Sequence, residues 1–258
     1  MRSVVITRIT RIALRILLIL ASVAVLVVAL VMGWLFFYTS DLPNVHILSS
    51  FAPEAPTAIP EADICGEKVQ VVAVPTNQMR DLRNALLAAE GDIDPSNALT
   101  HLYHDSFSEA GGKRYGSYSF QVSRQLFCED HRGALNRALS ELRTSVQLER
   151  QFTTNQLLDI YLNRAYFGPG IYGIENAAEQ YLSKPATQLS VPEAALLVGL
   201  IRNPHRFSPR VHPDRALVRR NEVIDAMAQR DSITSEQAER AKSTPLGTIA
   251  DDSAKPRS

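Results

Sequence analysis

Hydrophobic and polar residues are unevenly distributed over the first forty positions. An uncharged apolar run extends from Ile16 to Tyr38, and no acidic residue occurs before Asp41. At about 1.5 Å per helical residue, this run is long enough to cross the ~30 Å hydrocarbon core of a bilayer. Its far end carries aromatic residues suited to the headgroup interface: Trp34, Phe36, Phe37 and Tyr38. We therefore predict a transmembrane helix over residues 16–38.

Arginines flank this run on its N-terminal side only, at Arg2, Arg8, Arg11 and Arg15. By the positive-inside rule, residues 1–15 form a basic cytoplasmic segment and the rest of the chain lies outside the membrane. A cleaved signal peptide is the alternative, but the apolar run is too long for one and no A-x-A cleavage site follows it. A buried core helix fits poorly with an uncharged run of this length.

The exported part begins with a segment of little periodicity. Residues 39–62 contain four prolines and are predicted to be a linker. Lys68 to Val74 alternates like a strand and ends at a proline. We expect a folded domain over residues 63–242 and a polar, disordered tail over residues 243–258.

Most of the domain has helical spacing. Met79 to Glu90 places apolar residues on one face, and a second amphipathic pattern runs from Leu135 to Val146. Capping boxes start later helices at Thr153, Ser190 and Thr234, and another helix is expected from Pro213 to Gln229. The pattern predicts a mainly α domain with one short β element.

Charge and cysteine content narrow the class of protein further. The chain has 27 basic and 27 acidic residues, so net charge gives no reason to expect a nucleic-acid partner. Cys65 and Cys128 both fall in the exported part, where they form either a disulfide or two structural thiols. The cysteines do not have zinc-type spacing.

Several polar residues stand at notable positions. Glu90 ends the first predicted helix in the context NALLAAEGD, and residues 116–124 read GSYSFQVSR. Arg137 and Glu141 are four residues apart and share a helix face. Taken alone, these features are explained by a solvated helix end, a polar loop and a surface ion pair worth a few tenths of a kcal/mol.

Two later segments complete the pattern. Residues 157–163 read LLDIYLN and precede the turn Gly168-Pro169-Gly170, and residues 219–224 read RRNEVI. The polar residues of the first segment suggest helix packing and a polar turn. Adjacent arginines in the second segment are typical of a solvated helix face.

In this order, five segments resemble the five motifs of peptidoglycan glycosyltransferases: Glu90 with its neighbours, residues 116–124, residues 137–141, residues 157–163 and residues 219–224. These are the family 51 transglycosylases, which include monofunctional biosynthetic transglycosylases and the glycosyltransferase domains of penicillin-binding proteins. The resemblance covers about residues 68–242 and is strongest from Leu148 onward. It implies a lysozyme-like, bilobal α fold whose cleft lies between a larger lobe and a smaller, membrane-proximal one. No transpeptidase module is expected after this domain.

The resemblance also implies roles for individual residues. Glu90 would be the catalytic base that deprotonates the attacking sugar hydroxyl. The departing diphosphate would be held by Glu141, Arg124 and Arg137. The second motif would contact substrate through Ser117, Ser119 and Gln121. The fifth motif, with Arg219 and Arg220, would help to hold the fold of the cleft.

The implied reaction joins lipid II to a growing glycan strand and releases undecaprenyl diphosphate. A divalent metal, Mg²⁺ or Mn²⁺, is the only cofactor expected, and it would assist the leaving group. Partners would be these lipid substrates, the bacterial plasma membrane and cell-wall synthesis proteins. The domain would lie in the extracytoplasmic space, where glycan is assembled.

The motifs depart from the family pattern near the expected diphosphate site. Gly91 replaces an aspartate after Glu90, about eight residues are missing before Ile93, and Ala138 replaces a lysine. A degenerate member that binds lipid II, glycan or a cell-wall partner without turnover is therefore an alternative. Hydrolysis of glycan is a second alternative, since a cleft with two carboxylates can cleave glycosidic bonds.

Overall fold

The structure is a computed structural model that describes residues 2–38, 44–64, 66–90, 118–127 and 134–247. Cys65, Cys128 and the end of the predicted tail lie outside these ranges. The helices are α1 (Arg2–Tyr38), α2 (Arg80–Glu90), α4 (Tyr118–Phe127), α5 (Ala134–Gln151), α6 (Thr154–Arg164), α7 (Ile174–Leu182), α8 (Val191–Ile201), α9 (Pro204–Phe207), α10 (Pro213–Gln229) and α11 (Ser235–Ser243). The strands and short 3₁₀ helices are β1 (Thr57–Ile64), β2 (Glu67–Ala73), β3 (Tyr166–Gly168), β4 (Ile171–Tyr172), η1 (Val45–Phe51), η2 (Thr76–Gln78) and η3 (Ala186–Gln188).

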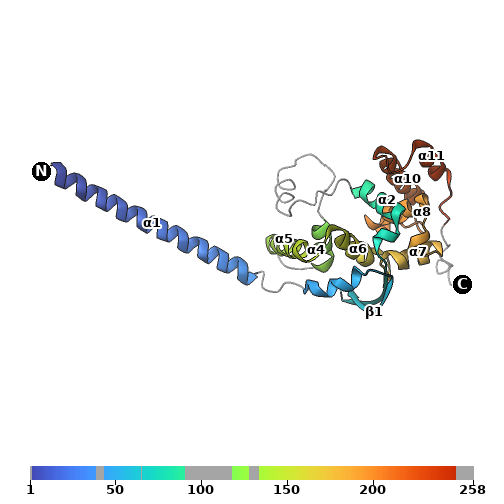
Figure 1. The fold of residues 1–258 in the computed structure, drawn as a ribbon, viewed down its shortest axis with the longest axis horizontal. Helices are drawn as coiled ribbons and strands as arrows, with labels where there is room; N and C mark the ends of the chain where they lie inside the picture. The colour runs from blue at the N-terminus through green and yellow to red at the C-terminus, as the bar shows by residue number, and fades with distance from the viewer. Residues whose placement is uncertain (1, 39–43, 65, 91–117, 128–133, 248–258) are drawn as a thin grey trace.

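Helix α1 projects away from the rest of the molecule as a single rod (Figure 1). It starts at Arg2, so the predicted basic segment and the apolar run form one continuous helix. Arg15–Trp34 has the length and composition of a membrane-spanning helix, and none of it is buried by the rest of the protein. The sequence contains no proline or glycine that would interrupt the helix before Gly33.

The linker prediction for residues 39–62 is wrong for its described part. From residue 44 the chain forms η1 and then β1, and η1 buries Val45, Leu48 and Phe51. The prolines that suggested a linker do not prevent this structure. Pro60 lies within β1, a strand at the edge of a two-stranded sheet, where the register shifts between Ile59 and Ala62. A proline is tolerated at such an irregular edge because no ladder hydrogen bond is lost.

The described chain contains two β-hairpins rather than the one β element expected. β1 pairs antiparallel with β2, which confirms the predicted strand near Lys68, and β3 pairs antiparallel with β4. Gly173 follows β4 with φ of 83°, and its N–H donates to the Ala165 carbonyl at 2.9 Å. A Cβ at this position would lie 2.9 Å from the Asn163 carbonyl oxygen, so only glycine fits.

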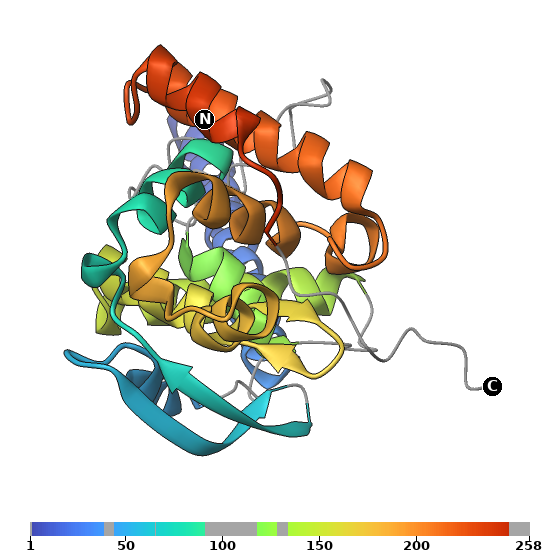
Figure 2. The same ribbon diagram turned by 90° about the vertical axis from the view of Figure 1, so that its right-hand side faces the viewer.

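The helices of the domain pack into two groups (Figures 1 and 2). The α8 group consists of α2, α8, α10 and α11, and the α4 group consists of α4, α5, α6 and η1. Helix α7 contacts both α6 and α8 and so connects the groups. This arrangement confirms the expected mainly α architecture with two lobes.

Helix α8 is the centre of its group. Its residues from Ala194 to Leu200 are all buried, as expected for a helix that is apolar on every side. The predicted capping box is present, because Glu193 accepts from the Ser190 N–H at 2.9 Å and Pro192 lies in the first turn. The capping boxes at Thr153 and Thr234 are also formed, and α10 has the predicted bounds.

Two buried polar residues of α6, Asp159 and Asn163, form the α6 polar cluster. The Asn163 Nδ2 donates to the carbonyl oxygens of Phe51 and Val74 at 2.8 and 3.0 Å, and its Oδ1 accepts from the Val74 N–H at 3.1 Å. The Asp159 Oδ1 accepts from the Thr76 N–H at 2.7 Å. The cluster therefore fixes the end of η1 and the segment between β2 and α2. This confirms the structural role expected for the fourth motif.

Replacing Asn163 by alanine is expected to destabilise the domain strongly. Three buried backbone groups would lose their partners, which costs on the order of 3 kcal/mol of unfolding free energy. Urea denaturation of the full chain in detergent, followed by circular dichroism, measures this loss. The control is Asn155→Ala, because Asn155 is an exposed α6 residue that accepts from Arg83 at 2.9 Å. Equal stability losses in the two variants would contradict the role of the cluster.

The α6 polar cluster also makes stability depend on pH. Burial raises the pKa of Asp159 above its ordinary value of 3.8, against the lowering effect of the Thr76 hydrogen bonds. The folded state thus holds this proton more tightly than the unfolded state, and the stabilisation is lost as the pH rises through the raised pKa. Asp159→Asn keeps an acceptor for Thr76 but cannot ionise. Above pH 3.8 the parent should lose unfolding free energy more steeply than this variant, and parallel pH profiles would refute the prediction.

Candidate active site

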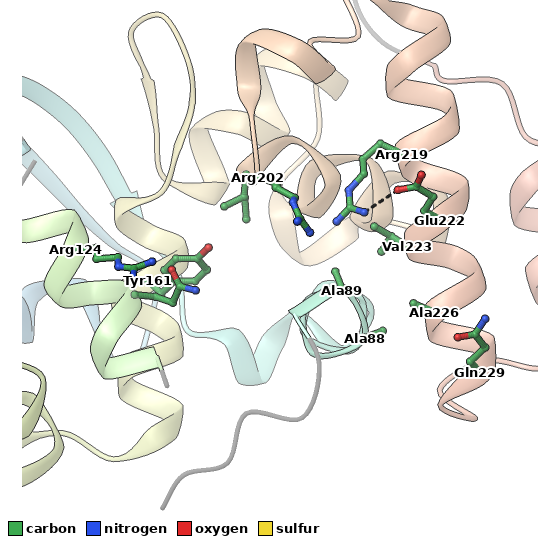
Figure 3. Close-up of a pocket in the computed structure, with 12 residues that line it drawn as sticks. Ala88, Ala89, Arg124, Tyr161, Arg202, Arg219, Glu222, Val223, Ala226 and Gln229 are labelled. Atoms are coloured by element: carbon green, nitrogen blue, oxygen red, sulfur yellow. Dashed lines mark hydrogen bonds and ion pairs between the residues drawn. The ribbon is translucent and has the colours of Figure 1, made fainter. Parts of the chain in front are cut away.

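A cavity of about 550 Å³ lies between the α8 group and the α4 group. This size lies within the range of small-molecule binding sites. Figure 3 shows α2, α8 and α10 on one side and α4 and α6 on the other. The lining residues are Ala88, Ala89, Gln121, Arg124, Tyr161, Ile201, Arg202, Arg219, Glu222, Val223, Ala226 and Gln229. With three arginines and one glutamate among these residues, the lining is net positive and suited to an anionic ligand.

Helix α2 ends at this cavity. Ala88 and Ala89 form part of its wall, and the next residue, Glu90, is the last of the helix. The side chain of Glu90 lies outside what the structure describes, as do residues 91–117, where the family pattern is broken. In the sequence, the predicted base therefore directly follows two residues that line the cavity.

The second motif supplies two of the predicted substrate contacts to the cavity. Gln121 and Arg124 are three residues apart on α4, so both face the same side and line the wall. Ser119 does not line the cavity. It is fully buried, and its Oγ donates to the Glu149 Oε1 at 2.6 Å, so its contact in this structure is with α5. Ser117 lies outside the described residues.

Glu141 joins the two arginines that are predicted to hold the diphosphate, Arg124 and Arg137. Its side chain is only 6% exposed, with Oε1 2.8 Å from the Arg137 Nε and Oε2 3.5 Å from the Arg124 Nε. The pair with Arg137 is thus more than a solvated helix-surface pair. Glu141 itself does not line the cavity, but it orients Arg124, which does.

Two arginines line the wall formed by α8 and α10, and sequence analysis did not place either of them in the site. Arg202 follows the last residue of α8 and belongs to none of the five motifs. Arg219 belongs to the fifth motif, to which only a fold-holding role was assigned. Its Nη1 lies 2.8 Å from the Glu222 Oε2, which also lines the cavity. The packing of α10 on α8 brings Arg202 and Arg219 to the same cavity, and no local sequence signal indicates this.

Adjacent arginines of α10 have different environments. Arg220 is 1% exposed and donates to the carbonyl oxygens of Thr244 at 2.6 Å and Lys242 at 2.8 Å. It therefore attaches the end of α11 to α10, and burial lowers its pKa. The expected fold-holding role of the fifth motif fits Arg220, whereas Arg219 faces the cavity.

Only the described ranges bear on possible ligands of the expected divalent metal. No three His, Cys, Asp or Glu side chains gather within the described ranges. The Glu141 carboxylate is engaged by two arginines, which makes it a poor ligand for a cation.

Comparison with known proteins gives the class of this domain. Residues 74–228 match the model of the family described as Transglycosylase. Because the match covers more than half of the chain, the protein belongs to this family. Membership confirms the resemblance and the lysozyme-like fold class, and it places the chain among the glycosyltransferases.

The individual relatives are penicillin-binding proteins. Penicillin-binding protein 1A of Aquifex aeolicus is 40% identical over 126 residues, which are 49% of this chain and 17% of that protein. Penicillin-binding protein 1A of Pseudomonas aeruginosa is 28% identical over 83% of this chain and 27% of the relative. Penicillin-binding protein 1F of Bacillus subtilis is 30% identical over 70% of this chain and 26% of the relative. The matched part is thus about a quarter or less of each relative.

The crystal structure of penicillin-binding protein 1A from Haemophilus influenzae is 25% identical to this chain. The alignment covers 52% of this chain and 17% of that one, with a TM-score of 0.36. The fold class therefore rests on the family match and on the helices described above.

Arg220→Ala is expected to lower the unfolding free energy by about 3 kcal/mol, because two carbonyl groups lose a charged donor. Arg220→Lys should fall between parent and alanine variant, since an ammonium cannot reproduce the planar guanidinium fork. Arg240→Ala is the control, since this exposed arginine forms an ion pair with Glu236 on its own helix. Urea denaturation of the three variants measures the effect, and a fully stable Arg220→Ala protein would contradict it.

Proposed function

We propose that this chain is a peptidoglycan glycosyltransferase that polymerises lipid II into glycan strands and releases undecaprenyl diphosphate. The observation that carries the proposal is the net positive cavity between the two helix groups. The helix bearing Glu90 ends at this cavity, and the cavity receives Gln121 and Arg124 of the second motif. All of these residues lie within the segment that matches the Transglycosylase family.

The first chemical requirement is removal of a proton from the attacking sugar hydroxyl. Glu90 is the carboxylate at the end of α2, directly after the two alanines that line the cavity. Ala88 and Ala89 contribute only methyl groups to the cavity wall, which leaves space in the cavity for a sugar. A base in this position would deprotonate the 4-hydroxyl of lipid II as that oxygen attacks C1 of the growing strand.

The second requirement is stabilisation of the departing diphosphate. A diphosphate is a good leaving group, so positive charge is needed more than protonation by an acid. Arg124 lines the cavity, and it shares the carboxylate of Glu141 with Arg137. Fixed cations of this kind stabilise negative charge without reorganising during the reaction.

Lipid substrates also require the domain to lie at the membrane surface. Helix α1 supplies a candidate span from Arg15 to Trp34 shortly before η1. The arginines before this span favour a cytoplasmic N-terminus, so the domain would face the extracytoplasmic side. There it would meet lipid II, the growing glycan strand and other cell-wall synthesis proteins.

The proposal is tested by polymerisation of labelled lipid II with the full chain in detergent. The parent should form glycan strands, and Glu90→Gln should reduce the rate at least a hundredfold because the base is lost. Glu54→Gln is the matched control, since Glu54 is exposed and lies outside the cavity lining. Gel separation of the labelled products measures the strands.

Other outcomes identify the alternatives. A folded parent that binds lipid II but forms no polymer would contradict the proposal in favour of binding without turnover. Release of soluble fragments from purified sacculi, without polymer from lipid II, would instead indicate hydrolysis. Equal polymerisation by the parent and Glu90→Gln would remove Glu90 from the mechanism.

A further inference from the structure

Two arginines on one wall of the cavity have no role in the steps described above. Arg202 and Arg219 come from α8 and α10, and Figure 3 shows their side chains near each other, across the cavity from Arg124. We call Arg202 and Arg219 the α8–α10 arginine pair. The cavity thus has positive charge on two opposite walls rather than in a single cluster.

Packing holds Arg219 in place against α8. A Cβ on Gly199 would lie 3.0 Å from the Arg219 Cγ, so the absence of a side chain at Gly199 makes room for this arginine. The ion pair with Glu222 at 2.8 Å fixes its guanidinium group from the other side. The Arg219 side chain is only 15% exposed, so its orientation toward the cavity is set by the protein.

Arg202 is more exposed than Arg219, and no described carboxylate forms an ion pair with it. Among the residues that the structure describes, no carboxylate lies within ion-pair distance of it, whereas Arg124 and Arg219 each have one. A cation after the last residue of a helix is favoured by the helix dipole, but this does not require it to line a cavity. Together with the glutamate-paired Arg219, Arg202 leaves this wall with an uncompensated positive charge.

The proposed reaction needs two lipid substrates, and both carry a diphosphate. The donor diphosphate leaves at the reacting carbon, where Arg124, Arg137 and Glu141 are assigned. The acceptor diphosphate stays bonded and lies at the far end of the attacking disaccharide. We infer that the α8–α10 arginine pair binds the diphosphate of the acceptor lipid. This inference rests on the proposed function.

An arginine pair with this role should affect substrate binding more than chemistry. Interactions that are equal in the ground state and the transition state change KM and leave kcat unaltered. Arg202→Gln and Arg219→Gln should each raise the KM for lipid II about tenfold while kcat stays within about twofold. Arg206→Gln and Arg215→Gln are matched controls, because both are exposed arginines of the neighbouring helices α9 and α10 that do not line the cavity.

Direct binding separates this inference from the proposed function. Fluorescence anisotropy of labelled lipid II with the full chain in detergent, with and without inorganic diphosphate as competitor, does not require turnover. The two pair variants should bind lipid II about tenfold more weakly than the controls, and inorganic diphosphate should compete less effectively against them. Arg202→Gln is decisive, because this exposed residue can be replaced without disturbing the core.

The outcomes distinguish the two ideas. Weaker binding in the pair variants with no polymer from the parent would support the diphosphate site and contradict turnover. Polymer from the parent with unchanged KM and binding in Arg202→Gln would overturn the inference alone. A fall in kcat with unchanged KM would also overturn it, because the pair would then act on the leaving diphosphate.

Discussion

The structure depends on hydrogen bonds from the buried α6 polar cluster to backbone that precedes α2. Asn163 satisfies groups of Phe51 and Val74, and Asp159 accepts from Thr76. Buried backbone groups without partners are costly, so the cluster allows one chain orientation and opposes others. Because η2 and α2 follow directly, the cluster positions the start of α2, and α2 also packs against α8. A residue pair that does not line the cavity thereby positions the helix that carries Glu90.

Opposite charges are distributed in the cavity in a way that suits a diphosphate. Each of Arg124 and Arg219 has a carboxylate that orients it, and Arg202 supplies charge that no described carboxylate balances. The paired glutamates reduce the net charge, but they also fix two flexible side chains in the absence of ligand. Preorganised cations lose less conformational entropy on binding than free ones.

Local signals in the sequence were sufficient for most helices, whereas the site depended on tertiary packing. Capping boxes and Pro213 predicted the start of α6, α8, α10 and α11 because such signals act within one helical turn. The linker prediction failed because four prolines outweighed the spacing of Val45, Leu48 and Phe51, whose burial depends on α5 and α6. Motif order predicted Gln121 and Arg124 at the cavity. It assigned Ser119 to substrate although that residue contacts Glu149, and it missed Arg202, which no local pattern marks.

The central claim is that this cavity transfers a glycosyl group from a lipid diphosphate. The most direct measurement is the ratio of undecaprenyl diphosphate released to glycosidic bonds formed when the full chain acts on lipid II in liposomes. One diphosphate should be released for each glycosidic bond formed. Binding of lipid II by a folded protein, with neither diphosphate released nor polymer formed, would contradict it.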